Sequence, residues 1–345
     1  MRTLIPSLLL AAFSLGAGAD LYAGTVRYWT PSVEDKKRKE VSVEGDIQSW
    51  NWKSGVSVKP FEEGKPSVTV ARKNLISATR TVSSALQNAL NNNNEQALKN
   101  LWNTAKSELD KEDAAFAYLG IQFANKDSVK AIAEHKKYTK SFNDGNYIAQ
   151  VLQQLADLQF GAGKSNDAIS TLADLAKLGD WQKASANVQI GHKLLNSKKT
   201  NKAATYFEQA IAPATKVQDA SLEMESLGWA GHTARLLDDN KKAKKHFDAF
   251  FKVNTEHGFN AGAAHARGIA YFGLGEIGGN TKDAYNNFRL ASFWLEGKPN
   301  EGKCFLKMMN IAEALAGTET DGAKWTKRAK KIKEIVQQRW PKLLE

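Results

Sequence analysis

The sequence predicts a mainly α-helical protein, an α-solenoid of antiparallel helix pairs preceded by a small β-barrel or β-sheet module. Three observations predict this fold class. Apolar residues alternate with a period of two over residues 20–75 and with a period of 3.6 over residues 76–345. Within the second region, a pattern of small and aromatic residues recurs. The chain has 345 residues, enough for about two domains with substantial cores.

The first element, residues 1–19, has the three parts of a secretory signal peptide. Arg2 gives a positive start, the stretch LIPSLLLAAFSL is apolar, and Ala17-Gly18-Ala19 provides small residues before Asp20. We therefore expect cleavage after Ala19 and a periplasmic or secreted protein, made by a bacterium. The alternative is a buried N-terminal helix. No later apolar run reaches the 18–20 residues of a membrane-spanning helix, so no stable membrane span is expected.

Net charge limits the classes of partner, and cysteine content limits the disulfides and metal centres that the chain can form. The formal net charge is +11, which favours acidic partners. Export separates the chain from nucleic acid, so we expect an acidic envelope surface or a protein rather than nucleic acid. The single cysteine, Cys304, excludes an internal disulfide and a cysteine-ligated metal centre, and its apolar helical surroundings predict a core position.

Residues 20–75 form the predicted β-module. Clusters of Gly, Pro and Ser separate its alternating segments, as in strands joined by hairpins. The succession of strands, a hairpin and a closing strand resembles a small SH3- or Sm-like barrel. Trp50 and Trp52 are expected to cover the open end of this module, and ligand stacking is the alternative. The alternating apolar residues are Val26, Tyr28, Val41, Val43, Ile47, Val56, Val58, Val68 and Val70.

Residues 76–345 contain about fourteen predicted helices, and the clearest repeats lie in 145–296. A small residue is followed at fixed offsets by an alanine and two core residues. The small residue lets two helices approach closely, and the aromatic residue fills the space between pairs. The four sets are Ala156 with Ala168, Leu172 and Leu175; Gly191 with Ala203, Phe207 and Ala210; Gly231 with Ala243, Phe247 and Phe250; and Gly268 with Ala284, Phe288 and Ala291, the last with four extra residues in the loop GLGEIGGN.

This small–aromatic pattern resembles the tetratricopeptide repeat (TPR). The resemblance is clear over 145–296 and weaker over 76–144 and 297–345, where a non-repeating helical bundle is the alternative. Residues 320–341 are expected to form a charged C-terminal capping helix. Its apolar residues are expected to dock on the preceding helix, while Trp325 and Trp340 could also rest on an anionic surface. The docking residues are Ala323, Ile332, Ile335 and Val336.

Two motifs resemble nucleotide-binding signatures, but neither lies in the structural context that such a site requires. Residues 161–165 resemble the end of a phosphate-binding loop, and residues 273–278 fit G-x-G-x-x-G, but both follow predicted helices rather than strands. The six histidines contain no zinc-binding pair, and no nucleophile elbow occurs. We therefore expect no catalytic residue, no cofactor and no metal.

The TPR resemblance implies a concave groove that binds a partner. His192 and His232 occupy equivalent positions, and the favoured interpretation is two solvated or hydrogen-bonded imidazoles. The sharper hypothesis is binding that depends on pH between about 5.5 and 8, because an unperturbed histidine has a pKa near 6.5. The implied groove residues are Gln153, Asp157, Phe160, His192, Leu195, His232, Arg235, His265 and Phe272.

The sequence thus predicts an exported, non-catalytic scaffold or adaptor that binds a protein or peptide partner in the cell envelope. An envelope enzyme acting on wall polymer is the alternative, with a site where the β-module meets the helices and convergent carboxylates or histidines in a deep pocket. A third possibility is a structural component that polymerises through its repeat ends.

Overall fold

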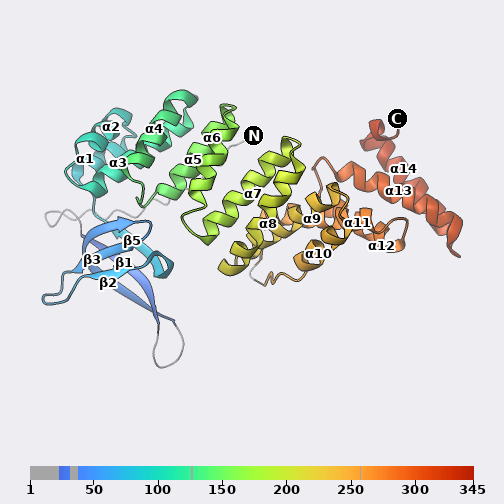
Figure 1. The fold of residues 1–345 in the computed structure, drawn as a ribbon, viewed down its shortest axis with the longest axis horizontal. Coiled ribbons are helices and arrows are strands. Elements are labelled where there is room, and N and C mark those ends of the chain that lie inside the picture. The colour runs from blue at the N-terminus through green and yellow to red at the C-terminus, as the bar shows by residue number, and fades with distance from the viewer. Residues whose placement is uncertain (1–22, 32–37, 126, 257) are drawn as a thin grey trace. The chain divides into compact units, whose positions relative to one another are not determined.

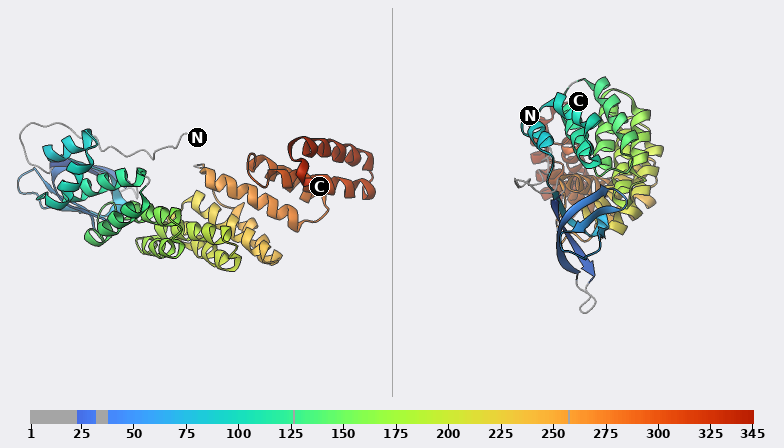
Figure 2. Two further views of the ribbon diagram at one scale, coloured as in Figure 1. Left: turned by 90° about the horizontal axis from the view of Figure 1, so that it is seen from above. Right: turned by 90° about the vertical axis from the view of Figure 1, so that its left-hand side faces the viewer.

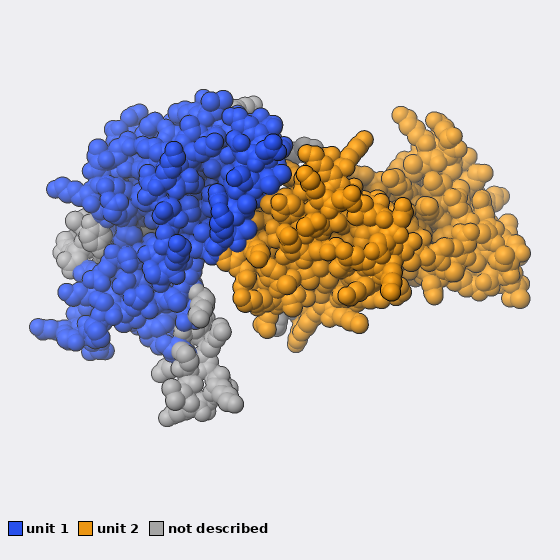
Figure 3. Space-filling model, in the orientation of Figure 1, with its two compact units in different colours: residues 1–178 blue, residues 179–345 orange. Residues whose placement is uncertain are grey.

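A computed structural model of the chain describes residues 23–31, 38–125, 127–256 and 258–345. The predicted signal peptide, residues 1–19, lies outside the described residues. The chain divides into two compact units, residues 1–178 and residues 179–345 (Figure 3).

The first unit begins with a five-stranded antiparallel sheet (Figure 1). Its strand order is β4-β3-β2-β1-β5. Its core consists of the valines and the isoleucine at the predicted inward positions. The predicted period of two is therefore confirmed for these residues, which are Val26, Ile47, Val56, Val58 and Val70. The elements are β1 (Ala23–Pro31), β2 (Arg38–Asn51), β3 (Gly55–Pro60), β4 (Val68–Val70), the 3-10 helix η1 (Arg72–Asn74) and β5 (Leu75–Arg80).

Strand β5 places the end of the β-module at Arg80 rather than at residue 75. It pairs with β1, with Val26 opposite Ala78. Its exposed Ile76 breaks the simple alternation that marks the other strands, so the period of two does not extend into this strand. Pairing with β1 across the sheet, a contact distant in sequence, decides the conformation.

Six helices complete the first unit. Side chains at the starts of α1 to α4 accept hydrogen bonds from backbone N–H groups of the first turn. In the α5–α6 pair, the repeat residues Ala156, Ala168, Leu172 and Leu175 are all buried, as predicted. The helices are α1 (Ser84–Asn91), α2 (Glu95–Thr104), α3 (Glu108–Ala124), α4 (Ser128–Ser141), α5 (Ile148–Gly161) and α6 (Ser165–Leu175).

The second unit is made of four consecutive helix pairs (Figure 2). Together with the helices of the first unit, this gives fourteen α-helices among the described residues. The predicted fold class, antiparallel helix pairs after a small β-module, is confirmed. The helices are α7 (Asp180–Asn196), α8 (Thr200–Val217), α9 (Ala220–Leu236), α10 (Asn240–Phe250), α11 (Ala261–Ile277), α12 (Lys282–Trp294), α13 (Glu301–Thr318) and α14 (Gly322–Arg339).

Glycines on the first helix of a pair make room for phenylalanines on the second. A Cβ atom on Gly191 would lie 2.7 Å from the Phe207 ring, and one on Gly231 would lie 2.4 Å from the Phe247 ring. Real Cβ contacts are essentially never this short, so only glycine allows these helices to pack at this distance. The predicted seating of aromatic rings on small residues is confirmed for these two pairs.

The fourth repeat differs from the prediction. Helix α11 continues to Ile277, so the first five residues of the predicted loop GLGEIGGN are helical. Phe288 consequently lies against Gly275, at 2.8 Å from the position of a Cβ atom, and Gly268 instead faces Leu295. Because α11 is longer than predicted, the glycine that contacts Phe288 is Gly275 rather than Gly268.

Helix α14 lies within residues 320–341, where the capping helix is predicted, but its buried face differs from the prediction. Ile332 and Val336 are buried, whereas Ala323 and Ile335 are exposed. Trp325 is buried and lies edge-on to Tyr285 of α12, with 5.1 Å between ring centroids, so it does not lie on a free surface. Cys304 of α13 is buried as predicted, and burial raises the pKa of its thiol to about 12. Among the described residues, no helix is long and apolar enough to cross a membrane.

Candidate partner-binding surface

The nine predicted groove residues fall in both compact units. Gln153, Asp157 and Phe160 lie on α5 of the first unit, where the Gln153 amide donates to the Asp157 carboxylate at 3.4 Å. The other six lie on α7, α9 and α11 of the second unit. The group in the second unit has the more distinctive arrangement.

Three histidines that were predicted to line the groove surround one tryptophan in the second unit. The indole of Trp229 on α9 meets His192 of α7 at 4.7 Å, His232 of α9 at 5.5 Å and His265 of α11 at 5.3 Å, measured between ring centroids. All three contacts are edge to face. Trp229 also stacks on Phe207 of α8, which seats against Gly191. Trp229 is only 9% exposed, so the partly exposed imidazoles provide most of what a partner could contact. We call Trp229 and the three histidines the histidine–tryptophan surface.

The imidazoles of this surface are partly buried and electrically neutral at neutral pH. Burial, with smaller contributions from neighbouring positive charges, lowers the pKa of His192 and of His232 to about 4. Burial lowers the pKa of His265 as well. The hypothesis of binding that depends on pH between about 5.5 and 8 requires these imidazoles to titrate in that range. His192 and His232 do not, because the whole range lies above their pKa. The favoured interpretation also needs correction, because these rings pack on an indole rather than lie in water.

The remaining predicted residues of the second unit have other roles. Arg235 on α9 forms an ion pair of 2.9 Å with Glu276 on α11. Leu195 on α7 is half-buried. Phe272 is 5% exposed and lies edge-on to Phe288 at 5.3 Å, inside the α11–α12 pair. Its assignment to the groove was wrong, because its ring packs on the core phenylalanine of α12.

Trp229 was missed by sequence reasoning. It lies two residues before Gly231, where the preceding repeat has Gln189 before Gly191. A large aromatic residue in place of a polar one was the available signal. Close packing of α9 on α11 also contributes, since a Cβ atom on Gly228 would lie 2.9 Å from the Cβ of Ala266. This close approach brings His265 to the indole.

A second cluster of charged residues lies in the first unit, where the β-module meets the helices. Arg80 of β5 donates to Asp110 and Asp113 of α3 at 2.9 and 2.6 Å. The Tyr147 hydroxyl donates to Asp113 at 2.8 Å, and the Tyr138 hydroxyl donates to Glu112 at 2.6 Å. These carboxylates converge as the enzyme alternative expected, but Asp110 and Asp113 are bound to Arg80 of the module. Glu112 is bound to Tyr138 of α4.

Backbone and aromatic contacts add to this attachment. The Trp52 N–H donates to the Asp144 carbonyl at 2.7 Å, and Asn51 forms a β-bridge with Gly145. The Trp52 indole donates to the Leu178 carbonyl at 3.0 Å and lies under the Arg72 guanidinium. Trp50, in contrast, packs on the core of the module. The two tryptophans thus have different structural roles, and the module docks on its neighbouring helices.

Glu112 makes the stability of the first unit depend on pH. Burial raises the pKa of this carboxyl group to about 7. Between its ordinary value and pH 7 the folded chain holds a proton that the unfolded chain has released, so stability falls as pH rises through this range. This difference between the pKa values of the folded and unfolded chain corresponds to on the order of 3 kcal/mol in the free energy of unfolding.

The variant Glu112→Gln is expected to remove this dependence, since its side chain still accepts from Tyr138 but does not ionise. Urea unfolding at pH 5 and pH 8 measures the effect. The variant should be the more stable protein at pH 8 and close to the parent at pH 5. The exposed Glu63→Gln serves as control. Identical pH profiles for the parent and Glu112→Gln would contradict this explanation.

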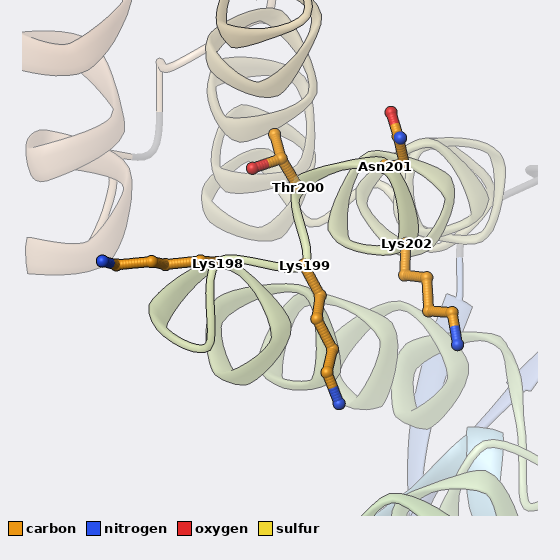
Figure 4. Close-up of a pocket in the computed structure, with 5 residues that line it drawn as sticks. All are labelled: Lys198, Lys199, Thr200, Asn201 and Lys202. Carbon is orange, nitrogen blue, oxygen red and sulfur yellow. The ribbon is translucent and has the colours of Figure 1, made fainter.

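A shallow cavity of about 490 Å³ lies at the turn between α7 and α8. Its lining residues are Lys198, Lys199, Thr200, Asn201 and Lys202, and the three lysine side chains extend outward from the turn (Figure 4). None of them was predicted as a site residue. Among the described residues, no group of three or more His, Cys, Asp or Glu side chains is placed to hold a metal ion.

Comparison with known proteins yields only distant structural likenesses. No family model and no curated protein sequence matches the chain. BtubC (BKLC) from P. vanneervenii is 14% identical with a TM-score of 0.46, over 64% of this chain and 92% of that one. The C-terminal part of a TPR repeat-containing protein from Cytophaga hutchinsonii is 15% identical with a TM-score of 0.45, over 74% and 94%.

YrrB, a TPR protein with an unusual peptide-binding site, is 16% identical with a TM-score of 0.39, over 57% of this chain and 91% of that one. All three scores are below 0.5, so the fold assignment rests on the helix pairs and the sheet of the chain itself.

Proposed function

We propose that this protein is a non-catalytic interaction scaffold that binds a partner protein or peptide at the histidine–tryptophan surface. One observation carries the proposal: His192, His232 and His265, from three different helices, meet on the indole of Trp229. Clusters of aromatic rings flanked by polar groups supply much of the binding energy in protein interfaces. The carboxylates at the β-module, in contrast, are engaged in holding the chain together, which favours the scaffold over the enzyme alternative.

Site-specific photo-crosslinking tests this proposal. A benzophenone amino acid replaces the exposed Asn196, one helical turn from His192 on α7, or the exposed Gln209 on α8 as the matched control. In an envelope fraction of the cells that make the protein, the Asn196 position should give a discrete protein adduct and the Gln209 position should not. Introducing His192→Ala should reduce that adduct at least fivefold, equivalent to about 1 kcal/mol of binding. Equal adducts at both positions, or no effect of His192→Ala, would refute the proposed surface.

We also propose that the protein is exported, with cleavage after Ala19. The positive start, apolar stretch and small-residue site of residues 1–19 support this proposal. The same envelope fraction provides the check, because the mature chain in it should begin at Asp20. A chain that keeps residues 1–19 in this fraction would argue against cleavage.

We infer that the β-module is an SH3- or Sm-like module. Its strand order, with β5 beside β1, and the 3-10 helix η1 immediately before β5 support this inference. The docking of Trp52 and Arg80 on the neighbouring helices gives the module a structural role in the first unit.

A further inference from the structure

Arg267 of α11 lies against two aromatic rings near the end of α12. Its guanidinium carbon is 4.5 Å from the ring centroid of Phe259, in the segment before α11, and 5.2 Å from the ring centroid of Trp294 on α12. Phe259 and Trp294 also contact each other, with 6.0 Å between their centroids. Contacts of this kind between a cation and ring faces are attractive, so they hold the guanidinium in place.

The Arg267 guanidinium has no counter-ion among the described residues. Its Nε atom is buried without a hydrogen-bond partner, but the side chain is only partly buried, so its terminal nitrogens reach the surface. Glu256 and Glu296, the acidic residues closest in sequence to the two rings, are exposed and form no ion pair with any described residue. The arginines that do form ion pairs there are Arg27, Arg80, Arg235 and Arg339.

A strongly exposed ring adjoins this arginine. Phe293 of α12 is 69% exposed, more than any other phenylalanine or tryptophan among the described residues, and lies edge-on to Trp294 at 5.3 Å between centroids. Phe259 and Trp294 are themselves partly exposed. Aromatic residues and arginine are enriched where protein interfaces gain most of their binding energy. We call Phe259, Arg267, Phe293 and Trp294 the arginine–aromatic patch.

The patch offers a positive charge beside apolar surface. A guanidinium presents two parallel N–H groups, whose geometry matches a carboxylate. The neighbours of this guanidinium are aromatic rings, whereas capture of a chain's C-terminal carboxylate uses a nest of backbone N–H groups. An acidic side chain within a segment therefore fits better, because the apolar residues on either side of it can cover the rings.

We propose that the arginine–aromatic patch is a second docking site, for a partner segment in which an acidic side chain lies between apolar side chains. This site goes beyond the proposed function and shares no residue with the histidine–tryptophan surface. Arg267 lies two residues after His265 on α11, and helical side chains at that spacing do not face each other. The two surfaces can therefore be tested separately.

Peptide titration of the full chain, followed by NMR at the indole N–H of Trp294, tests this proposal. The Trp294→Phe variant identifies that signal. The probe is a pentapeptide blocked at both ends, with glutamate between two leucines and an alanine at each end, and the comparison peptide has glutamine in place of glutamate. The glutamate peptide should bind at least about fivefold more tightly.

Variants of the chain locate the source of this preference. Arg267→Gln should reduce it to less than about twofold. The control Lys330→Gln removes the same charge from the exposed face of α14 in the same unit and should leave the preference unchanged. Phe293→Ala should weaken both peptides at least about threefold and keep the preference, because this exposed ring contributes apolar contact and not charge.

Four results would overturn the proposal. They are equal affinities of the two peptides for the parent chain, an unchanged preference in Arg267→Gln, an equal loss of preference in Lys330→Gln, and no shift of the Trp294 signal at millimolar glutamate peptide. A glutamine peptide with a free C-terminal carboxylate provides a further check. If it bound more tightly than the blocked glutamate peptide, the patch would bind a chain terminus and the proposed acidic segment would be wrong.

Discussion

Phe247→Ala is expected to lower the free energy of unfolding of residues 179–345 by about 3–5 kcal/mol. Phe247 is fully buried on α10 and lies against Gly231 of α9 and Gly273 of α11. Its removal leaves a cavity between two glycines, which carry no side chains that could fill it. A domain is stable by only about 5–15 kcal/mol, so this is a large fraction of the total.

Urea unfolding of the full chain, with hydrogen exchange of peptides from α9 to α12, measures this loss. Phe293→Ala on α12 is the matched control, because that ring is 69% exposed and its truncation should change stability by less than about 0.5 kcal/mol. Equal losses for the two variants would show that Phe247 does not join the helix pairs.

Arg80→Ala is expected to destabilise the first unit by about 3–5 kcal/mol. Arg80 of β5 is buried and is bound to both Asp110 and Asp113 of α3. Truncation leaves two carboxylates near each other without their cation, in a site where water does not reach Asp110 readily. Hydrogen exchange should show α3 and β5 losing protection together.

Arg27→Ala provides the control for this prediction. Arg27 pairs with Glu40 on the sheet, but its side chain is 50% exposed, so its loss should cost less than about 1 kcal/mol. A small effect of Arg80→Ala, similar to that of Arg27→Ala, would mean that the buried ion pairs do not hold the β-module to the helices.

Local spacing predicts much of this fold. Gly191 with Phe207, and Gly231 with Phe247, are set by the offsets between two helices joined by a short turn. The valines of the sheet are likewise set by a period of two within each strand. Both patterns arise inside one helix pair or one strand, where sequence distance and spatial distance are closely related.

Features that depend on helix length or on distant contacts were not predictable in this way. Phe288 contacts Gly275 rather than Gly268 because α11 runs further than its glycine-rich sequence indicated. Phe272 is a core residue because it packs on Phe288 of the neighbouring helix. Strand β5 is defined by its pairing with β1, about fifty residues earlier in the chain. Trp229 contacts histidines from three helices. These contacts depend on how α7, α9 and α11 pack on one another.

The coupling between Gly231 and Phe247 tests the interlocking of helix pairs most directly, and it completes the first prediction. In the parent chain, Gly231→Ala should cost about 1–3 kcal/mol, since its Cβ atom would lie 2.4 Å from the ring. In the Phe247→Ala background, the same substitution should stabilise by about 0.5–1 kcal/mol, because alanine favours a helix more than glycine does. A change of sign between the two backgrounds is the predicted result. The same cost in both would contradict the account of rings seated on glycines.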